Sequence, residues 1–256
     1  MATLDTKDFE QPLMRIIKYY TGDVEFNIND LRKAHSEIVA IAQKRNLPVP
    51  NDVYSMIAAT YISKAKKIEG VSKINEYYNS ALDIYQELLK SISVEKDPSI
   101  YSDTQKKIGG IYWELSNYLN KQENSRKSIK AYSEALKVYT PEGTPIDYAM
   151  TQNNLGTAYN RLAEVEDKAQ NCKSANEEAL KVYTPEDFPM QYAMTKASLG
   201  KAYGTLAEVE DKAQNCKRAL NAYEEALKVF TKEEFPESYQ LVEQNLKKLI
   251  EFCKGK

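Results

Sequence analysis

The stretch Leu-Ala-Glu-Val-Glu-Asp-Lys-Ala-Gln-Asn-Cys-Lys occupies residues 162–173 and occurs again, unchanged, at residues 206–217. The two copies lie 44 positions apart, and a second shared stretch, Ala-Leu-Lys-Val-Tyr-Thr-Pro, begins at both Ala135 and Ala179. A fixed spacing of this kind indicates a repeat protein, in which each unit buries its apolar face against its neighbours. We therefore expect an array that binds through its surface.

The repeat extends beyond the identical stretch on both sides. Gly109 matches Gly200 at an offset of 91, and Tyr85 matches Tyr223 at an offset of 138, each within a run of similar residues. This alignment predicts four units, at about 51–97, 98–144, 145–188 and 189–235. A single C-terminal capping helix is expected within 236–256.

Each unit is predicted to form two helices, because apolar and small residues recur at spacings of three and four, the spacing of one helical face. The first helix of each pair begins with a proline in its first turn, where the missing N–H costs nothing. These prolines are Pro98, Pro145, Pro189 and Pro236. For first helices, the expected side-chain caps are Asp97 or Thr144. For second helices, capping boxes are expected, and the pairs are Asn120 with Glu123, Asp167 with Gln170, and Asp211 with Gln214.

Two glycines, Gly156 and Gly200, recur where the helices of a pair would approach most closely. A glycine inside a helix costs about 1 kcal/mol relative to alanine, so its recurrence indicates a close backbone contact. The facing positions are expected to carry the small residues Ala175, Ala219 and Ala226.

Three residues are missing from the third unit. After Lys217 the chain reads Arg-Ala-Leu-Asn-Ala-Tyr-Glu-Glu-Ala-Leu, whereas after Lys173 it reads Ser-Ala-Asn-Glu-Glu-Ala-Leu, without the aromatic residue Tyr223. Because three residues correspond to about 300° of helix rotation, the second helix must shift its start or rotate its face, unless the loop absorbs the change. We expect weaker packing near Ala175 and Ala179, which would produce a pocket or a hinge there.

The pattern Leu-Gly-x-x-Tyr at 199–203, followed by Ala-x-x-x-Tyr-x-x-Ala at 219–226, resembles the tetratricopeptide repeat (TPR). The units of 44 to 47 residues are longer than the usual repeat of about 34, and in this they are similar to the kinesin-light-chain variant. The stretch Ala-Glu-Val-Glu-Asp-Lys-Ala is similar to sequences in repeat arrays of methanogenic archaea. The resemblance covers about 51–254 and implies a right-handed all-α solenoid of antiparallel helix pairs, with a concave groove lined by the first helices.

The first fifty residues are predicted to form a helix pair of their own, at Pro12–Tyr20 and Asp30–Arg45. Asn27 or Asn29 is expected to cap the second of these helices. The pair is either a degenerate repeat or an unrelated cap over the apolar face of the first unit, which a stacked array requires.

The resemblance implies that a protein or peptide binds to groove positions on the first helices, and these positions vary between units. The expected binding residues are Asn153, Asn154, Thr157, Asn160 and Arg161, flanked by Lys106, Trp113 and Lys201. Asparagine is a poor helix former, and its amide can bond an extended peptide backbone. A solvated face is the alternative for the asparagines, and a half-buried position between units is the alternative for Trp113.

Some TPR domains hold a C-terminal carboxylate with a clamp of lysine, asparagine and arginine side chains. In this sequence only Lys106 and Asn154 fall at matching positions, while Gly110, Met194 and Ser198 replace the other members. We therefore expect this clamp to be absent.

Composition excludes several classes of partner. Thirty-five basic and thirty-seven acidic residues give a net charge of −2, so no overall field favours nucleic acid or an anionic membrane. The chain has no apolar run of the roughly 20 residues that a membrane span needs, and residues 1–10 are too polar for a signal peptide. A cytoplasmic location is expected.

The sequence offers little for catalysis or for binding a metal or cofactor, and none of these is expected. His35 is the only histidine, and three cysteines do not suggest a disulfide framework. Cys172 and Cys216 hold the same repeat position and are expected to be packed, unbonded neighbours. The alternative is a lowered thiol pKa in the first turn of a helix.

We expect a non-catalytic scaffold that binds an unidentified protein or peptide in its groove. One alternative is a structural solenoid that assembles with itself into a homo-oligomer. Another is a small-ligand sensor or an enzyme that uses the irregular third unit.

Overall fold

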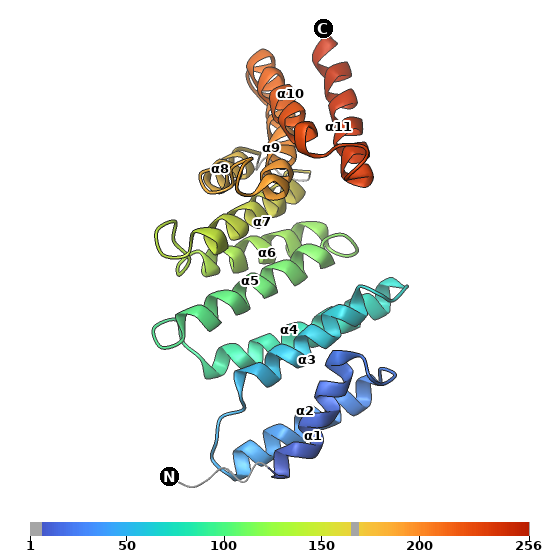
Figure 1. Cartoon of the computed structure of the whole chain (residues 1–256), viewed down its shortest axis with the longest axis vertical. Coiled ribbons are helices and arrows are strands. Elements are labelled where there is room, and N and C mark those ends of the chain that lie inside the picture. Colours follow the sequence, from blue (N-terminus) through green and yellow to red (C-terminus); the bar gives the residue numbers. More distant parts are fainter. Residues whose placement is uncertain (1–6, 165–168, 256) are drawn as a thin grey trace. The chain divides into compact units, whose positions relative to one another are not determined.

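The computed structural model describes residues 7–164 and 169–255 (Figure 1). Over these two ranges the chain forms eleven α-helices and no β-strand, which confirms the expected all-α class. The helices are α1 (Lys7–Thr21), α2 (Ile28–Lys44), α3 (Asn51–Ala65), α4 (Val71–Ser91), α5 (Pro98–Leu115), α6 (Lys121–Ala135), α7 (Pro145–Ala163), α8 (Ala169–Ala179), α9 (Pro189–Val209), α10 (Lys212–Val229) and α11 (Pro236–Lys254).

Two compact units divide the chain, Met1–Thr104 and Gln105–Lys256, and the division falls inside α5. Helices pack in consecutive pairs within the units, α1 with α2 and α3 with α4 in the first, and α7 with α8 and α9 with α10 in the second. First helices also contact one another across pairs, since α7 contacts α9 and α9 contacts α11. Compact units do not mark repeats, so the boundaries of the four repeats stay a prediction.

In the first unit, α1 begins at Lys7, five residues before the predicted start at Pro12. A proline inside a helix removes one hydrogen bond to the residue four positions earlier, and α1 includes it within its second turn. The N-terminus of α2 is capped by Asn27, whose side-chain oxygen accepts from the backbone N–H groups of Asn29 and Asp30 at 3.0 and 3.1 Å. Asn27 is therefore the cap, and the alternative, Asn29, is wrong.

In the second unit, first helices begin with the predicted prolines. Pro145, Pro189 and Pro236 are the first residues of α7, α9 and α11, and each occupies a position where a backbone N–H has no partner within the helix. The predicted cap Thr144 is wrong, because its side chain makes no capping bond. Its hydroxyl accepts from the N–H of Thr140 at 3.2 Å instead and closes the preceding turn.

Of the predicted capping boxes, the one at Asp211 forms its cap bond, since Asp211 Oδ1 accepts from the N–H of Gln214 at 3.3 Å. The box at Asn120 is wrong, because Asn120 makes no side-chain capping bond. Its expected partner Glu123 pairs instead with Lys127 at 2.7 Å, one helical turn further on. The third predicted box, at Asp167, lies outside the described residues.

The recurrent glycines do mark close helix contacts, but the residues that lie against them are not the expected alanines. A Cβ added to Gly200 would lie 2.9 Å from the ring of Tyr223, and one added to Gly109 would lie 2.7 Å from the ring of Tyr132. Real Cβ atoms do not approach other atoms so closely, so α5 and α9 each require glycine where the tyrosine of the next helix packs.

Despite the three missing residues, the described helix α8 has a single buried face. Cys172, Ala175, Asn176 and Ala179, spaced by three, one and three residues, are all buried. Because three residues are nearly one turn of 3.6, a shorter helix keeps its buried face toward α7. Ala175 and Ala179 are both buried, so the weaker packing predicted near them does not expose either side chain. Instead, the deletion brings the polar Asn176 against Gly156, where a Cβ would lie 2.5 Å from the amide nitrogen.

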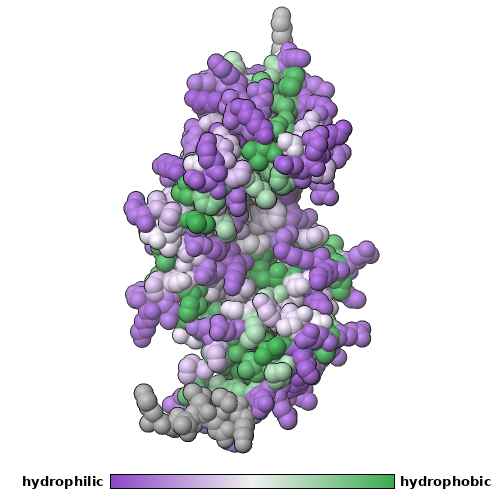
Figure 2. Space-filling view, viewed as in Figure 1, coloured by the Kyte–Doolittle hydropathy of each residue, from purple (hydrophilic) through white to green (hydrophobic). Residues whose placement is uncertain are grey.

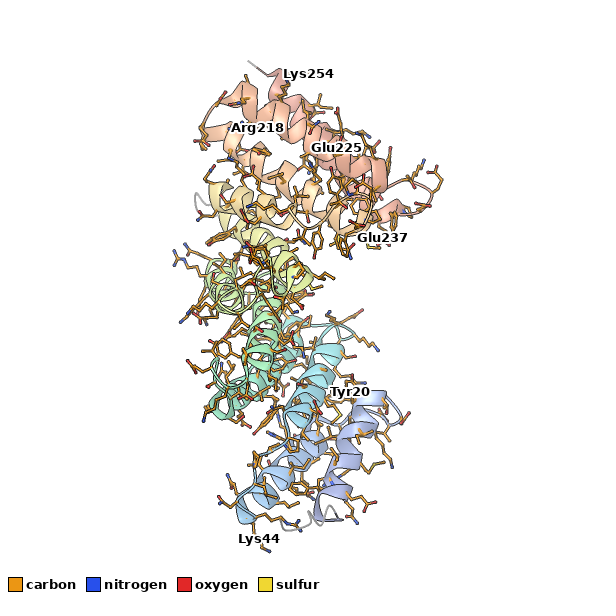
Figure 3. The ribbon with its side chains drawn as sticks, turned by 60° about the vertical axis from the view of Figure 1, so that its left-hand side comes forward. Tyr20, Lys44, Arg218, Glu225, Glu237 and Lys254 are labelled. Atoms are coloured by element: carbon orange, nitrogen blue, oxygen red, sulfur yellow. A yellow bond between two sulfur atoms is a disulfide. The ribbon has the colours of Figure 1, made fainter. Side chains whose placement is uncertain are left out.

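The C-terminal helix α11 packs against α10 and also contacts α9, with Val242 and Leu249 buried. Figure 3 labels Glu237 and Lys254 near its two ends. A disulfide joins Cys253 of α11 to Cys216 of α10, with the two Cα atoms 6.0 Å apart. Cys172 and Cys216 are not bonded to each other, as expected. The expectation that Cys216 is unbonded is wrong, because it pairs with a cysteine of the final helix.

Candidate functional site

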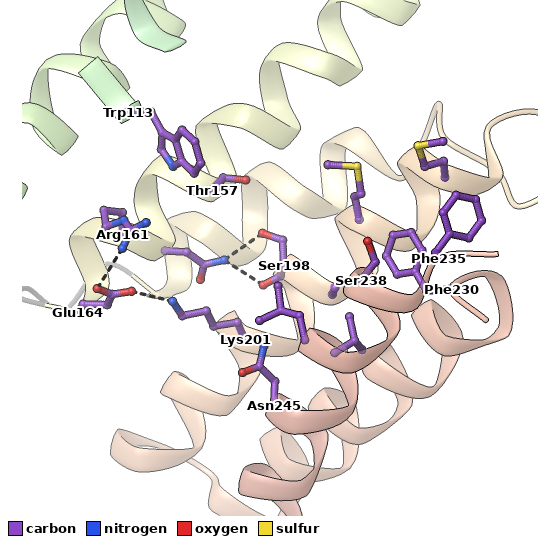
Figure 4. Close-up of a pocket in the computed structure, with 16 residues that line it drawn as sticks. Trp113, Thr157, Arg161, Glu164, Ser198, Lys201, Phe230, Phe235, Ser238 and Asn245 are labelled. Atoms are coloured by element: carbon purple, nitrogen blue, oxygen red, sulfur yellow. Dashed lines mark hydrogen bonds and ion pairs between the residues drawn. The ribbon is translucent and has the colours of Figure 1, made fainter. Parts of the chain in front are cut away.

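A cavity of about 360 Å³ opens in the second unit, and five of the eight predicted groove residues line it (Figure 4). These five are Trp113, Thr157, Asn160, Arg161 and Lys201. The other three predicted residues, Lys106, Asn153 and Asn154, are not part of its lining. The pocket therefore brings together five of the eight predicted residues and leaves out three.

First helices supply most of the walls of this cavity, which we call the groove pocket. Asn160 comes from α7, Met194 from α9 and Leu241 from α11, while Trp113 extends from α5. The segment between α10 and α11 adds Phe235. Since α7, α9 and α11 begin at equivalent prolines and contact in sequence, side chains at equivalent positions come together.

One end of the groove pocket is apolar. Phe230 and Phe235 lie there, at the end away from Arg161 and Glu164 (Figure 4), with their ring centroids 5.7 Å apart. The remaining apolar lining residues are Met190, Met194, Ala197, Leu241 and Val242. Val242 and Phe230 are buried, so this end of the pocket is a fixed apolar floor.

An exposed apolar stripe leads into this end. Met150, Met194 and Leu241 occupy equivalent positions of α7, α9 and α11 and are 40, 51 and 61% exposed. One turn earlier, Ile146 and Met190 are 50 and 46% exposed. The space-filling view likewise shows hydrophobic side chains in patches among hydrophilic ones (Figure 2). A contiguous exposed apolar surface commonly marks an interaction site.

The other end of the groove pocket is charged and centres on Glu164. Lys201 Nζ lies 2.7 Å from Glu164 Oε1, Lys121 Nζ lies 2.8 Å from Oε2, and Arg161 Nη1 lies 3.7 Å from Oε2. Burial raises the pKa of Glu164, but hydrogen bonds from the two lysines and the charges of Lys201 and Arg161 outweigh it and lower the pKa to about 2. Among the described residues, one carboxylate thus faces three cations at this end.

Between the two ends, two buried polar atoms have no hydrogen-bond partner within the described chain: Asn160 Oδ1 and Trp113 Nε1. Asn160 is 6% exposed, and its Nδ2 donates to the carbonyl and hydroxyl oxygens of Ser198 at 3.0 and 2.9 Å. That pair of bonds fixes the amide and leaves its oxygen as the unpaired acceptor. A buried polar atom without a partner costs about 1–3 kcal/mol, so a rearrangement that supplies a partner to either atom is favoured.

Two of the predicted residues outside the pocket have structural roles. Asn153 Oδ1 accepts from the Thr195 hydroxyl at 2.9 Å and joins α7 to α9. Lys106 Nζ lies 2.7 Å from Asp147 Oδ1 and 5.0 Å from the ring centroid of Tyr139. Asn154 is half-buried. Trp113 combines features of both alternatives, since it is half-buried against the cluster around Tyr132 and also lines the pocket.

The cysteine that remains free, Cys172, is fully buried, and burial raises the pKa of its thiol to about 12. The alternative of a lowered thiol pKa is therefore wrong for Cys172. In the first unit His35 is also buried, with Nε2 3.4 Å from Glu87 Oε2, and burial lowers its pKa. These two groups pack within the helix array.

Within residues 7–164 and 169–255, no three His, Cys, Asp or Glu side chains are grouped so that they could hold a metal ion. None of the helices in the same part of the chain combines the length and the apolar character that crossing a membrane requires.

Sequence reasoning missed the apolar end of the pocket. Phe230 and Phe235 flank the connection before the last helix, and Leu241 belongs to the helix assigned only as a cap. The signal was available, because Pro236 follows Pro189 by 47 positions and the same offset takes Met194 to Leu241. Treating α11 as a further first helix would have placed Leu241 in the groove.

The geometry describes a pocket with one apolar end, one charged end and two buried, unpaired polar atoms in its lining residues. No family model matches the chain, and no curated protein matches it either.

Proposed function

We propose that this chain is a TPR-like scaffold, a right-handed solenoid of helix pairs that performs no catalysis and binds a protein or peptide in the groove formed by its first helices. The observation that carries the proposal is the groove pocket, where an exposed apolar stripe meets two unpaired buried polar atoms. Interfaces commonly combine a buried apolar anchor with a few well-placed polar contacts.

The polar atoms favour a ligand with a peptide backbone. Asn160 Oδ1 is an acceptor and Trp113 Nε1 is a donor, and both are buried beside an open cavity. A backbone offers an N–H donor and a C=O acceptor at every residue. A peptide that moves the neighbouring side chains aside can therefore pair with both atoms while its own side chains occupy the apolar end.

Selection from a display library of random peptides tests this function. The chain is immobilised, and peptides are counter-selected against the double variant Asn160→Ala, Leu241→Asn. We expect enrichment of peptides that bind the natural chain and lose affinity for the variant, while circular dichroism shows equal helicity for both. Enrichment of peptides that bind both proteins equally, or no enrichment, would overturn the proposal.

Self-assembly is the second candidate function, favoured by one observation on α11. Leu241 is 61% exposed and Phe252 is 36% exposed on the last helix of the chain. Light scattering over a range of concentrations separates the two functions. A mass that increases with concentration, and that Leu241→Asn holds at the monomer value, supports assembly into a homo-oligomer.

We propose a cytoplasmic location from the sequence, but this location and the disulfide lead to opposite expectations for the redox state of the two bonded cysteines. Reducing systems keep most cytosolic thiols free, whereas Cys216 and Cys253 are bonded. Alkylation of the chain immediately after acid quenching of its source cells tests the location. Two alkylated thiols at these positions agree with the cytoplasm, and two unmodified, bonded cysteines contradict it.

A further inference from the structure

We propose that the bond between Cys216 and Cys253 is a reversible redox site, opened by a small anionic thiol that binds in the cavity beside the bond and attacks Cys253. This site is separate from the groove, because its cavity and the groove pocket share no lining residue. Three features carry the inference: a cavity that reaches both cysteines, two lysines in its lining, and the places of the cysteines in their helices.

A cavity of about 710 Å³ lies beside the disulfide, and both Cys216 and Cys253 belong to its lining. We call this cavity the disulfide pocket. Its walls come from α10 and from the C-terminal end of α11, two helices that pack against each other (Figure 1). Cys253 is half-buried, whereas Cys216 is only 6% exposed. A small molecule in this pocket therefore reaches Cys253 more readily than Cys216.

The charges of the disulfide pocket favour an anion. Among its described lining residues, Lys212 and Lys217 are cations and Glu224 is the single anion. Lys212 Nζ donates to the Gly255 carbonyl at 2.6 Å, and because an ammonium group has three N–H donors, donors remain for a carboxylate. Lys217 is exposed. The two lysines attract an anionic ligand by an electrostatic interaction that salt weakens.

The helix positions of the two sulfur atoms set the direction of the attack. Cys253 lies in the last turn of α11, where the helix dipole disfavours a thiolate. Cys216 lies in the second turn of α10, near the helix end that favours negative charge. In thiol–disulfide exchange, the thiol with the lower pKa is the better leaving group. We therefore expect the attacking sulfur to bond to Cys253 while Cys216 leaves.

The exchange takes place in two steps. First, the thiolate of the small thiol forms a bond to Cys253 Sγ, the protein disulfide breaks, and its electron pair stays on Cys216 Sγ, which takes a proton from water. Then a second thiolate attacks the small-thiol sulfur of this mixed disulfide and releases Cys253 as a thiolate, which is protonated in turn. Two molecules of the thiol are thereby oxidised to their disulfide, and the protein bond is reduced by two electrons. The reverse reaction closes the bond again.

Opening of the bond releases the C-terminal end of α11. Leu249 is the last buried residue of this helix, and beyond it Phe252 is 36% exposed. The disulfide ties this end covalently to α10, and Lys212 adds its bond to the Gly255 carbonyl and a contact 4.6 Å from the ring centroid of Phe252. We therefore expect residues 250–254 to fray after reduction, while the part of α11 up to Leu249 stays packed.

The test uses the full chain with reduced glutathione, a tripeptide thiol of net negative charge, and with its diethyl ester, which has the same thiol but no free carboxylate. After acid quenching, mass spectrometry counts the free thiols and locates the bound glutathione. We expect a mixed disulfide on Cys253 and closure of the reduced chain by oxidised glutathione. Per thiolate, glutathione is expected to open the bond about two- to fivefold faster than the ester at low salt, with a smaller ratio at 0.5 M NaCl.

A pair of lysine variants tests the disulfide pocket itself. Lys217→Gln is expected to remove most of the preference for glutathione over the ester. Lys248→Gln makes the same change of charge at an exposed residue of α11 outside the lining, and it is expected to keep the preference. In the reduced chain, hydrogen exchange is expected to be at least about tenfold faster at the amides of residues 250–254 and unchanged in α7.

Three outcomes would overturn the proposal. They are an adduct found on Cys216 alone, equal rates of opening by glutathione and its ester, and a reduced chain that oxidised glutathione does not close. Each of these outcomes leaves the proposed function in place, because neither Cys216 nor Cys253 lines the groove pocket. Conversely, failure of the peptide selection leaves the redox site in place.

Discussion

Asn176 packs against Gly156 in the position that Tyr223 takes against Gly200 in the next helix pair. A Cβ on Gly156 would lie 2.5 Å from Asn176 Nδ2, and a Cβ on Gly200 would lie 2.9 Å from the Tyr223 ring. Asn176 Nδ2 donates to the carbonyl of Cys172 at 2.8 Å, while its buried Oδ1 has no partner in the described chain. The deletion in the third unit thus replaced an aromatic contact with an incompletely paired amide.

Substitution of Gly156 by alanine is expected to destabilise the second unit by about 1–3 kcal/mol, the usual cost of overpacking. The added Cβ meets an amide that is fixed inside the helix contact. Gly204→Ala on α9 is the matched control, since its Cβ would lie 3.5 Å from Leu249, an ordinary contact. That control is expected to stabilise the chain by up to about 1 kcal/mol through helix propensity. Urea unfolding measures both, and effects of the same sign would contradict the close contact.

Replacement of Asn176 by leucine is expected to raise the free energy of unfolding by about 1 kcal/mol, because it removes a buried oxygen without a partner. The matched control is Asn215→Leu on α10. Asn215 is also buried, but its Nδ2 donates to the Glu210 carbonyl at 2.8 Å. We expect that control to lower the stability by about 1 kcal/mol. A loss of stability in Asn176→Leu would show that the asparagine is well satisfied.

Loss of the disulfide is expected to lower the free energy of unfolding by about 3 kcal/mol. The bond joins positions 37 residues apart, and the segment that it closes contains most of α10 and nearly all of α11, the last wall of the groove pocket. Reduction by dithiothreitol and the variant Cys253→Ser should give the same shift in thermal unfolding. If the reductant leaves the melting temperature of the natural chain unchanged, the bond is absent in solution.

The third cysteine provides a control for that experiment. Cys172 is buried, and its raised pKa of about 12 keeps the thiol protonated at neutral pH. Ellman's reagent is therefore expected to find no reactive thiol in the folded, oxidised chain and one in the oxidised chain unfolded in guanidinium. A thiol that reacts rapidly in the folded chain would contradict the burial of Cys172.

Protonation of Glu164 is expected to weaken the charged end of the groove pocket. Its folded pKa of about 2 lies below the usual value of 4.5, so its contribution to stability is present above pH 4.5 and is lost as the pH falls toward 2. The stability difference between the natural chain and Glu164→Gln should therefore be largest near pH 6 and vanish near pH 2. Because this carboxylate is largely exposed to solvent, we expect a difference below about 1 kcal/mol, reduced further by 1 M NaCl. A difference that does not change with pH would contradict the assigned ion pairs.

The sequence was sufficient to predict the helices because local features specify them. Prolines set the starts of α7, α9 and α11, and glycines marked the contacts with Tyr132 and Tyr223. Caps were harder to predict, since Thr144 and Asn120 have suitable side chains but do not use them. A hydroxyl or amide near a helix start has several local partners, and the sequence alone does not show which one it chooses.

The site could be predicted only in part, because the repeat alignment covers equivalent positions and the pocket also uses unique ones. Asn160 and Lys201 were found as groove positions of the third and fourth units. Phe235 was missed because α11 was assigned only as a cap. The bond between Cys216 and Cys253 depends on how α11 packs, and the positions of α7 and α9 that correspond to Cys253 carry leucine, Leu162 and Leu206.

Acrylamide quenching of Trp113 tests the central claim, that peptides bind in the groove pocket, most directly. A display-selected peptide is added until the anisotropy of its label shows saturation, and the quenching constant of the single tryptophan is compared with that of the free chain. We predict that saturation lowers the quenching constant at least twofold in the natural chain, and that Leu241→Asn requires more peptide for the same effect. An unchanged quenching constant at full saturation would contradict the account, because the peptide would then be bound elsewhere.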